Sequence, residues 1–100
     1  MLAISGLLRF PAEQRDEMLG VLSTLAERTR RDDGCVEYWW SEDLAEPGVF
    51  RFFECWETEA TFTAHRNAAY EIEFNDTYLT RIVGAEARQY DVSGVQSLTG

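Results

Sequence analysis

The chain has 100 residues, of which 45% are hydrophobic and 27% are charged, so we expect one globular domain. Its formal net charge is −9, and its nine basic residues are scattered apart from one short cluster within residues 28–31, which makes nucleic acids and anionic membranes poor partners. The sequence lacks a run of about 18 apolar residues and a signal-peptide pattern, so we expect no transmembrane helix and a cytoplasmic location.

The first third of the chain predicts a strand followed by a helix. Residues 2–10 have the pattern of a strand, and Pro11 suits the first position of a helix because its missing N–H costs nothing there. Apolar residues recur at helical spacing through 12–31 and predict one amphipathic helix. Asp33-Gly34 then gives a stop and turn signal.

The middle of the chain predicts a β-hairpin that is apolar on both faces. Its arms are residues 35–40 and 49–56. Neighbouring side chains of a strand point to opposite faces, so Phe52 and Phe53 lie on opposite sides of the sheet, as do the two adjacent tryptophans of the first arm. A sheet with one solvated face would alternate apolar and polar residues. Both faces of this hairpin therefore need cover.

The last part of the chain predicts two helical segments and a strand. Thr58 is a suitable N-cap for a helix that runs to about residue 66. A second helical segment covers about 68–82, where aromatic residues recur at four-residue steps. Residues 85–92 have the pattern of a final strand, and 93–100 form a polar tail.

The predicted order βαββαβ is the ferredoxin-like pattern of the α+β class, a four-stranded antiparallel sheet with both helices on one face. We expect a single domain over 1–92, with 93–100 as a C-terminal tail. Helices of the same chain would cover one face of the hairpin. A second copy would cover the other, since a domain of this size gains from burying more surface. The sequence thus predicts a homodimer with an aromatic-lined cavity.

Cysteine and histidine are scarce in this chain. Cys35 and Cys55 lie on the two arms of the hairpin, and we expect two buried thiols, with a disulfide or redox pair as the alternative. Two thiols and the single His65 are too few for a typical structural zinc site, so we expect no metal. No glycine-rich phosphate loop follows the first strand, so nothing indicates a nucleotide.

Several short motifs resemble the antibiotic biosynthesis monooxygenase (ABM) domain. In chain order they are Asp33-Gly34-Cys35, Tyr38, Phe52-Phe53-Glu54-Cys55-Trp56-Glu57, Phe62, Ala64-His65 and Tyr70 through Phe74. The resemblance covers roughly residues 2–92 and implies a dimeric α+β barrel with the ferredoxin-like fold. The family it points to includes cofactor-independent monooxygenases that convert phenols or hydroquinones to quinones with molecular oxygen. Other members bind and degrade haem.

The resemblance also implies roles for individual residues. Trp56 matches the tryptophan that lines the family pocket at the end of the third strand, and His65 matches the histidine of the helical stretch that follows. Tyr70 stands where many members have a second histidine, Phe62 where a pocket tyrosine is found, and Phe52 where oxygenase members often have asparagine. We expect catalytic roles for His65, Trp56 and Tyr70, and substrate contacts from Phe52, Glu54, Phe62 and Phe74.

The sequence leaves a structural interpretation open for each of these residues. Glu54 shares a strand face with Trp56, and it either pairs with an arginine or is a buried carboxyl of raised pKa that handles a phenol proton. Trp56 is either core or pocket wall. His65 is either a satisfied structural histidine or an acid–base group, and Tyr70 either packs or donates to a substrate oxygen.

The function predicted is a cofactor-independent monooxygenase that oxidises a phenol or hydroquinone-type aromatic molecule to a quinone with molecular oxygen. His65 would be the base, Tyr70 would donate a hydrogen bond to the substrate anion, and aromatic residues would exclude water. Two alternatives stay open. One is a haem-binding or haem-degrading protein that uses His65, and the other is a dimer that binds a small aromatic molecule without catalysis.

Overall fold

A computed structural model describes all residues, 1–100. The elements are β1 (Leu2–Arg9), a 3₁₀ turn (Ala12–Gln14), α1 (Arg15–Thr29), β2 (Cys35–Glu42), β3 (Val49–Trp56), α2 (Glu59–Arg66), α3 (Ala69–Tyr78), a second 3₁₀ turn (Leu79–Arg81) and β4 (Gly84–Asp91). The predicted order is confirmed, with β2 two residues longer than predicted, the other strand ends shifted by one residue at most, and larger differences at the helix ends. The first turn after Pro11 and the last turn before β4 are 3₁₀ rather than α-helical, as is common at helix termini.

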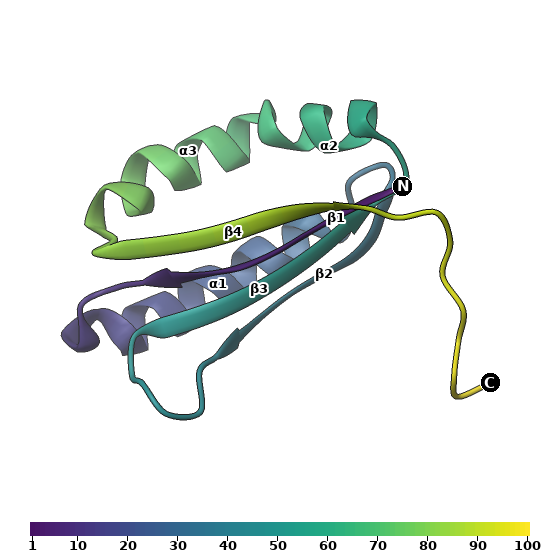
Figure 1. Cartoon of the computed structure of the whole chain (residues 1–100). Coiled ribbons are helices and arrows are strands. Elements are labelled where there is room, and N and C mark those ends of the chain that lie inside the picture. Colours follow the sequence, from purple (N-terminus) through teal and green to yellow (C-terminus); the bar gives the residue numbers. More distant parts are fainter.

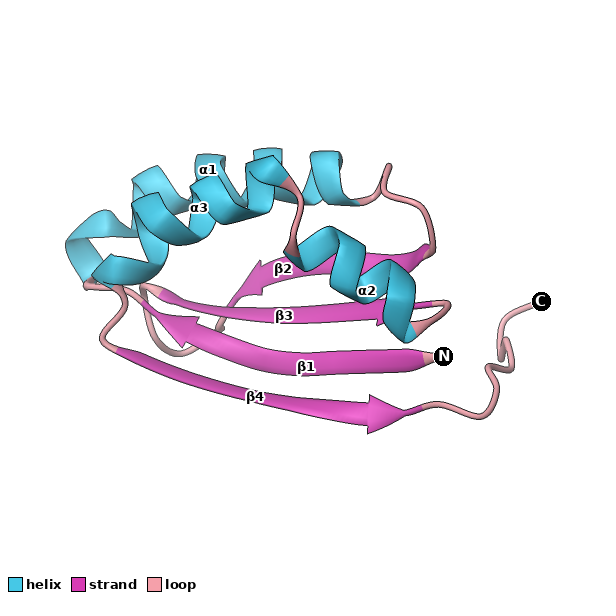
Figure 2. Cartoon of the chain, turned by 90° about the horizontal axis from the view of Figure 1, so that it is seen from above, coloured by secondary structure: helices cyan, strands magenta, loops and turns pink.

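The four strands form one antiparallel sheet in the order β2-β3-β1-β4. The three helices lie on one face of this sheet and leave the other face uncovered (Figures 1 and 2). The α+β ferredoxin-like fold predicted from the sequence is confirmed. None of the helices has both the length and the apolar composition that a membrane span requires.

The hairpin of β2 and β3 is apolar on both faces, as predicted. On the face toward the helices the rings of Trp40 and Phe52 are 4.8 Å apart. On the opposite face Trp39 stacks on Phe53 at 5.8 Å, and Trp39 remains 40% exposed. We call this second, uncovered surface the outer face. It also carries the exposed Tyr90 of β4, which pairs with Ala3 of the neighbouring strand.

Two groups of buried side chains join the helices to the sheet. The larger comprises Phe10, Met18, Leu22, Leu25, Phe50 and Phe74, and the smaller comprises Leu2, Ile4 and Trp56. The larger group lies under α1 and α3. The smaller lies where β1 and β3 pass beneath α2, and it is beside the polar cluster described below.

The helices leave β4 uncovered on the helix side as well. Every residue of this strand after Gly84 is exposed, including Ala87 and Gln89, whose pairing partners on β1 face the helices. A Cβ on Gly6 would lie 2.9 Å from the end of the Phe52 ring, so the absence of a side chain lets that ring lie over β1. We call Phe52, Ala87 and Gln89 the inner strip.

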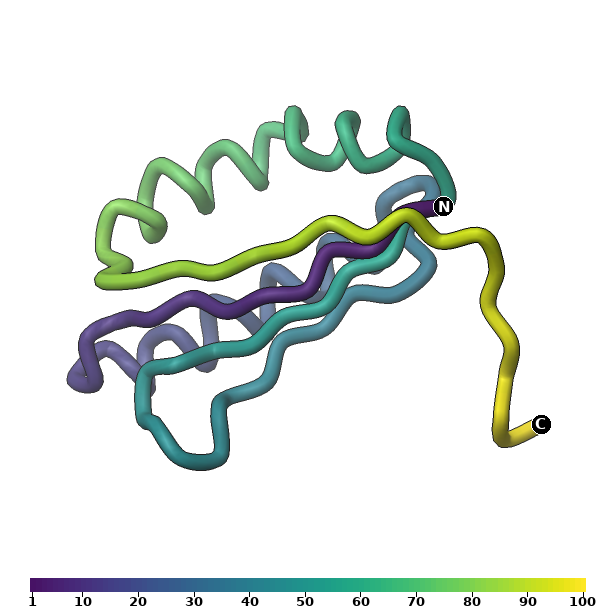
Figure 3. The backbone as a smooth tube through the Cα atoms, viewed as in Figure 1, coloured from purple at the N-terminus to yellow at the C-terminus, as the bar shows by residue number.

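Beyond Val92 the tail runs away from the domain (Figure 3).

Candidate functional site

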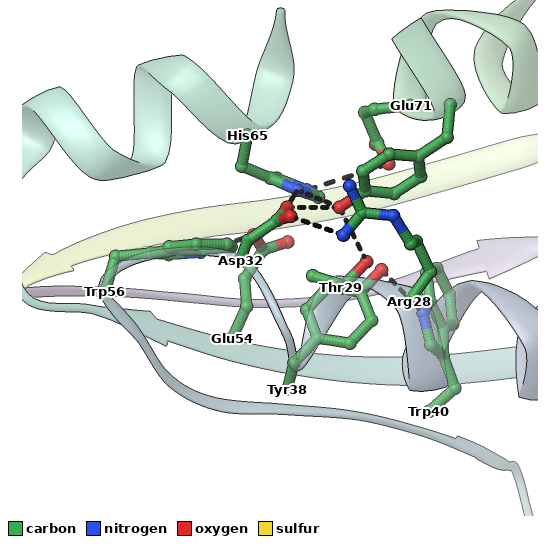
Figure 4. A network of polar contacts seen from close by, with 10 residues as sticks. Arg28, Thr29, Asp32, Tyr38, Trp40, Glu54, Trp56, His65 and Glu71 are labelled. Carbon is green, nitrogen blue, oxygen red and sulfur yellow. Dashed lines mark hydrogen bonds and ion pairs between the residues drawn. The ribbon is translucent and has the colours of Figure 1, made fainter. Parts of the chain in front are cut away.

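A cluster of polar side chains lies where the C-terminal end of α1 meets α2 and α3 above the sheet (Figure 4). We call its members the His65 cluster: Arg28, Thr29, Asp32, Glu54, Trp56, His65, Tyr70 and Glu71. They come from four separate segments of the chain, namely the end of α1 with the turn after it, β3, α2 and α3, so the cluster exists only in the folded protein.

Two local features bring Asp32 beside His65. After α1 the chain turns at Gly34, whose φ of +78° is one that residues with a side chain rarely adopt. Helix α2 starts with a capping box in which Thr58 and Thr61 exchange hydrogen bonds, as the predicted N-cap requires. A Cβ on Gly34 would lie 2.5 Å from the Thr61 side chain, so the turn and the start of α2 are in direct contact. Their contact fixes the position of α2, and with it His65, relative to the turn that carries Asp32.

The imidazole of His65 is held from one face and one edge. It is only 3% exposed and stacks on the indole of Trp56, with ring centroids 4.7 Å apart. Its Nδ1 lies 3.1 Å from Oδ2 of Asp32 and 2.9 Å from the hydroxyl of Tyr70. An ionised Asp32 only accepts hydrogen bonds, so this contact assigns the proton to Nδ1 and leaves the lone pair on Nε2.

Asp32 stays ionised although it is half-buried. Burial alone would raise its pKa, but hydrogen bonds from Tyr70, His65 and Arg28 outweigh burial and hold the pKa of Asp32 below its usual value. The hydroxyl of Tyr70 donates to Asp32 and lies 3.3 Å from Oγ1 of Thr29. Arg28 donates to Asp32 at 2.7 Å and lies over the Tyr70 ring, 4.3 Å from its centroid. Asp32 is thus the common acceptor of three donors.

Two carboxyl groups lie on the other side of the imidazole. Oε2 of Glu71 is 3.6 Å from Nε2 of His65, and burial, followed by the charges of Glu54 and Asp32, raises the pKa of Glu71 to about 7. Glu54 accepts a hydrogen bond of 2.9 Å from the Trp56 indole, and burial raises its pKa. Within the chain the hydrogen-bond donor to Glu54 is therefore the indole, and Arg66 acts on it only as a more distant charge.

The structure brings most of the predicted site residues together. Trp56, His65, Tyr70 and Glu54 are in the His65 cluster, and the Phe62 ring is 6.2 Å from the Trp56 ring. Phe52 is on the same face of the sheet but contacts Trp40.

Phe74 is apart from the other predicted residues. It is buried in the larger core group under α1 and α3, with Tyr78 as its aromatic neighbour at 5.5 Å. No three His, Cys, Asp or Glu side chains are grouped so that they could hold a metal ion.

Sequence reasoning missed Asp32 and Glu71. Asp32 had a usable signal, because an acidic residue just after a helix opposes the negative end of the macrodipole and so needs another explanation. Glu71 had none, since an acidic residue in the first turn of α3 suits the helix by itself.

Comparisons with known proteins agree on one family. Residues 1–76 match the family model of the antibiotic biosynthesis monooxygenases. A crystal structure from Deinococcus radiodurans, provisionally assigned to that family, is 26% identical, covers both chains fully and has a TM-score of 0.88. An uncharacterised Synechocystis protein, sll1783, is 26% identical over 97% of this chain and 67% of its own length. Bacillus subtilis YcnE, provisionally named a monooxygenase, is 26% identical over 70% of this chain and 74% of its own.

The family match covers three quarters of the chain, and it includes every member of the His65 cluster. The Deinococcus structure matches over the whole length, so the shared fold extends through β4. These likenesses support a monooxygenase in general terms. The chain belongs to the antibiotic biosynthesis monooxygenase family.

Proposed function

We propose that this protein is a cofactor-independent monooxygenase that oxidises a phenol or hydroquinone-type aromatic molecule to a quinone. Molecular oxygen is the co-substrate: one oxygen atom enters the ring, the other leaves as water, and the substrate supplies the electrons. The observation that carries the proposal is the orientation of His65, whose Nδ1 is anchored on Asp32, so that the lone pair of Nε2 can take up a substrate proton, directly or through the neighbouring Glu71. Family membership supports the class of reaction.

The role of the protein is to bind the substrate and to ionise it. A phenolate gives up an electron to oxygen far more readily than a phenol, so removal of one proton starts the reaction. The substrate ring would lie on the inner strip, between Phe52 and Phe62, where aromatic side chains suit a flat apolar molecule. Burial lowers the pKa of His65, which keeps the imidazole neutral and able to take up a proton near neutral pH.

The proposed role of Tyr70 differs from the one expected from the sequence. Its hydroxyl is already in contact with Asp32, Thr29 and the Nδ1 edge of His65. A group engaged in this way orients the imidazole and does not reach a substrate oxygen. We therefore assign Tyr70 to positioning His65, together with Asp32.

Haem is not supported by the same geometry. An axial ligand needs a nitrogen that faces open space above the macrocycle. Nδ1 of His65 is bound to Asp32 and Tyr70, Nε2 faces Glu71 at 3.6 Å, and Trp56 covers one face of the ring. The only histidine therefore does not fit the role of a haem ligand, and titration with haemin is expected to give no sharp Soret shift that depends on His65.

The proposal is tested by oxygen uptake. Metal-free protein is mixed in air with a panel of one- to three-ring phenols and hydroquinones, and oxygen consumption and quinone absorbance are followed together. We expect uptake above the uncatalysed rate for at least one ring size, with a loss of roughly 100-fold or more in His65→Gln. Glu73→Gln, which changes an exposed carboxyl of α3, is the matched control.

Two results would count against the proposal. Uptake at the uncatalysed rate across the whole panel would overturn it. If the same compounds nevertheless quenched tryptophan fluorescence in a saturable way, the protein would be a binding dimer without catalysis, which is the remaining alternative.

We also propose that the protein is a homodimer joined through the outer face. The stacked Trp39 and Phe53 and the exposed Tyr90 give this face an aromatic surface that a monomer leaves in water. A second copy presents the same surface, so the contact is self-complementary about a two-fold axis.

A further inference from the structure

We propose that Glu71 is the base that faces the substrate and that His65 stands behind it, so that the two side chains share one proton. The pairing of the two groups is a property of the folded protein by itself. The assignment of the phenol as proton donor rests on the function proposed above.

The first step of the argument is access. The side chain of His65 is 2% exposed, with Trp56 against one face and Asp32 and Tyr70 at Nδ1. Its remaining nitrogen, Nε2, points toward Glu71, whose side chain is more open, at 15%. A substrate hydroxyl that approaches the imidazole therefore meets the Glu71 carboxyl first. Figure 4 shows this carboxyl beside the ring.

The second step is the unequal surroundings of the two carboxyl oxygens of Glu71. Oε2, the oxygen nearest Nε2, is buried and has no hydrogen-bond partner. A buried acceptor without a donor is costly. At 3.6 Å the two atoms lie just beyond hydrogen-bond distance, so a proton on either one, with a small approach of the two side chains, gives Oε2 its missing partner. Oε2 alone of the two oxygens is buried without a partner, so we assign Oε1 as the oxygen that meets the substrate.

The third step is charge. The groups that face this pair are Arg28 from the end of α1, Asp32 from the turn after it, Tyr38 from β2, Glu54 from β3, Arg66 from α2 and Tyr70 from α3. Burial and then the carboxylates of Glu54 and Asp32 raise the pKa of Glu71 to about 7, against the pull of Arg66. Burial lowers the pKa of His65, against the pull of Asp32. The two pKa values shift in opposite directions, upward for Glu71 and downward for His65, so the usual order of the two groups is not kept and the pair titrates as a unit.

The step that follows is a simple proton transfer. The O–H bond of the phenol breaks and its proton goes to Oε1 of ionised Glu71, which leaves a phenolate on the inner strip. The pair of Glu71 and His65 then holds one additional proton. This proton is either on Glu71 or on Nε2 of His65, where Asp32 stabilises the imidazolium. After the reaction with oxygen the proton leaves with the water that is formed.

The pairing is tested by NMR, for which the single histidine is an advantage. Histidine labelled with ¹⁵N is titrated in the wild-type protein, in Glu71→Gln and in the control Glu73→Gln. We expect the wild type to show two steps at His65, one of them near pH 7, and Nδ1 protonated above it. In Glu71→Gln we expect one step at lower pH, because the carboxylate that stabilises the imidazolium is gone. A His65 titration in Glu71→Gln that matches the wild type would overturn the pairing.

Activity then tests the catalytic role. With a substrate found by oxygen uptake, Glu71→Gln is expected to lose roughly 100-fold or more in kcat and the limb of the pH profile near 7, whereas Glu71→Asp regains part of the rate. Near-ultraviolet circular dichroism checks that the variants are folded. Unchanged kcat and pH profile in Glu71→Gln would overturn the role of Glu71. If no substrate is found, the proposed function fails, and the NMR titration still decides whether the pair exists.

Discussion

The imidazole of His65 and the indole of Trp56 are stacked, with centroids 4.7 Å apart and planes inclined by 26°. The same indole donates to Glu54 at 2.9 Å, and its side chain is fully buried. Trp56 therefore supports two titratable groups at once, one through its ring face and the other through its N–H. This double contact makes it the residue on which the geometry of the His65 cluster depends most directly.

Replacement of Trp56 separates its two contacts. Trp56→Phe keeps an aromatic ring under His65 but removes the donor to the buried Glu54, so we expect the free energy of unfolding to fall by about 1–3 kcal/mol. Trp56→Ala also leaves a cavity in the core, and we expect a loss of about 3–5 kcal/mol. Urea unfolding followed by circular dichroism measures both. A Trp56→Phe variant as stable as the wild type would show that the indole N–H contributes nothing.

The raised pKa of Glu71 has a definite sign in the dependence of stability on pH. Its pKa is about 7 in the folded protein and near 4.5 in the unfolded chain, so the folded state binds more protons between these values. Stability from this group is complete below about pH 4.5 and is lost as pH rises through about 7.

Glu71→Gln removes this loss. We expect its stability relative to the wild type to increase from pH 5 to pH 8 by up to about 3 kcal/mol. Asp32 acts in the opposite direction, because its lowered pKa makes its stabilisation disappear on acidification, and this contribution is the same in both proteins. Urea midpoints at pH 5 and pH 8 measure the difference. A constant difference between variant and wild type at the two pH values would contradict a raised pKa for Glu71.

The outer face gives a direct test of the dimer. Phe53→Glu replaces the ring that stacks on Trp39 with a charge. In a contact about a two-fold axis it also brings like charges of the two copies together. We expect the wild type to sediment as a dimer and Phe53→Glu as a monomer. Leu44→Glu changes a fully exposed apolar residue in the hairpin loop and is expected to remain dimeric. A monomeric wild type would remove the proposed interface.

Replacement by alanine is expected to change the stability of the protein in opposite directions at two glycines. Gly20 lies within α1 with nothing near its missing Cβ, so Gly20→Ala is expected to stabilise the protein by about 0.5–1 kcal/mol. Gly34→Ala forces a positive φ on alanine and a clash with Thr61, and we expect a loss of about 2 kcal/mol or more. Thermal unfolding of the two variants checks both signs. A neutral Gly34→Ala would show that the turn beside α2 can relax.

The sequence by itself determined the elements and the faces of the sheet. Strand alternation placed Phe52 and Phe53 on opposite sides, and the N-cap at Thr58 marked the start of α2, because both features depend on neighbours along the chain. These patterns led to the ferredoxin-like order and placed Trp56, Glu54 and Phe52 on one face of the sheet, whereas the resemblance implied that this face is the helix side.

Only the tertiary structure decided what His65 contacts. Asp32 is 33 positions before His65 in the chain, and it reaches the imidazole only because the Gly34 turn packs against α2. The indole as the partner of Glu54, the burial of Phe74 in the other core group and the carboxyl of Glu71 at Nε2 were likewise hidden from local patterns. Such contacts depend on how separate elements pack, and neither spacing nor propensity along the chain records that packing.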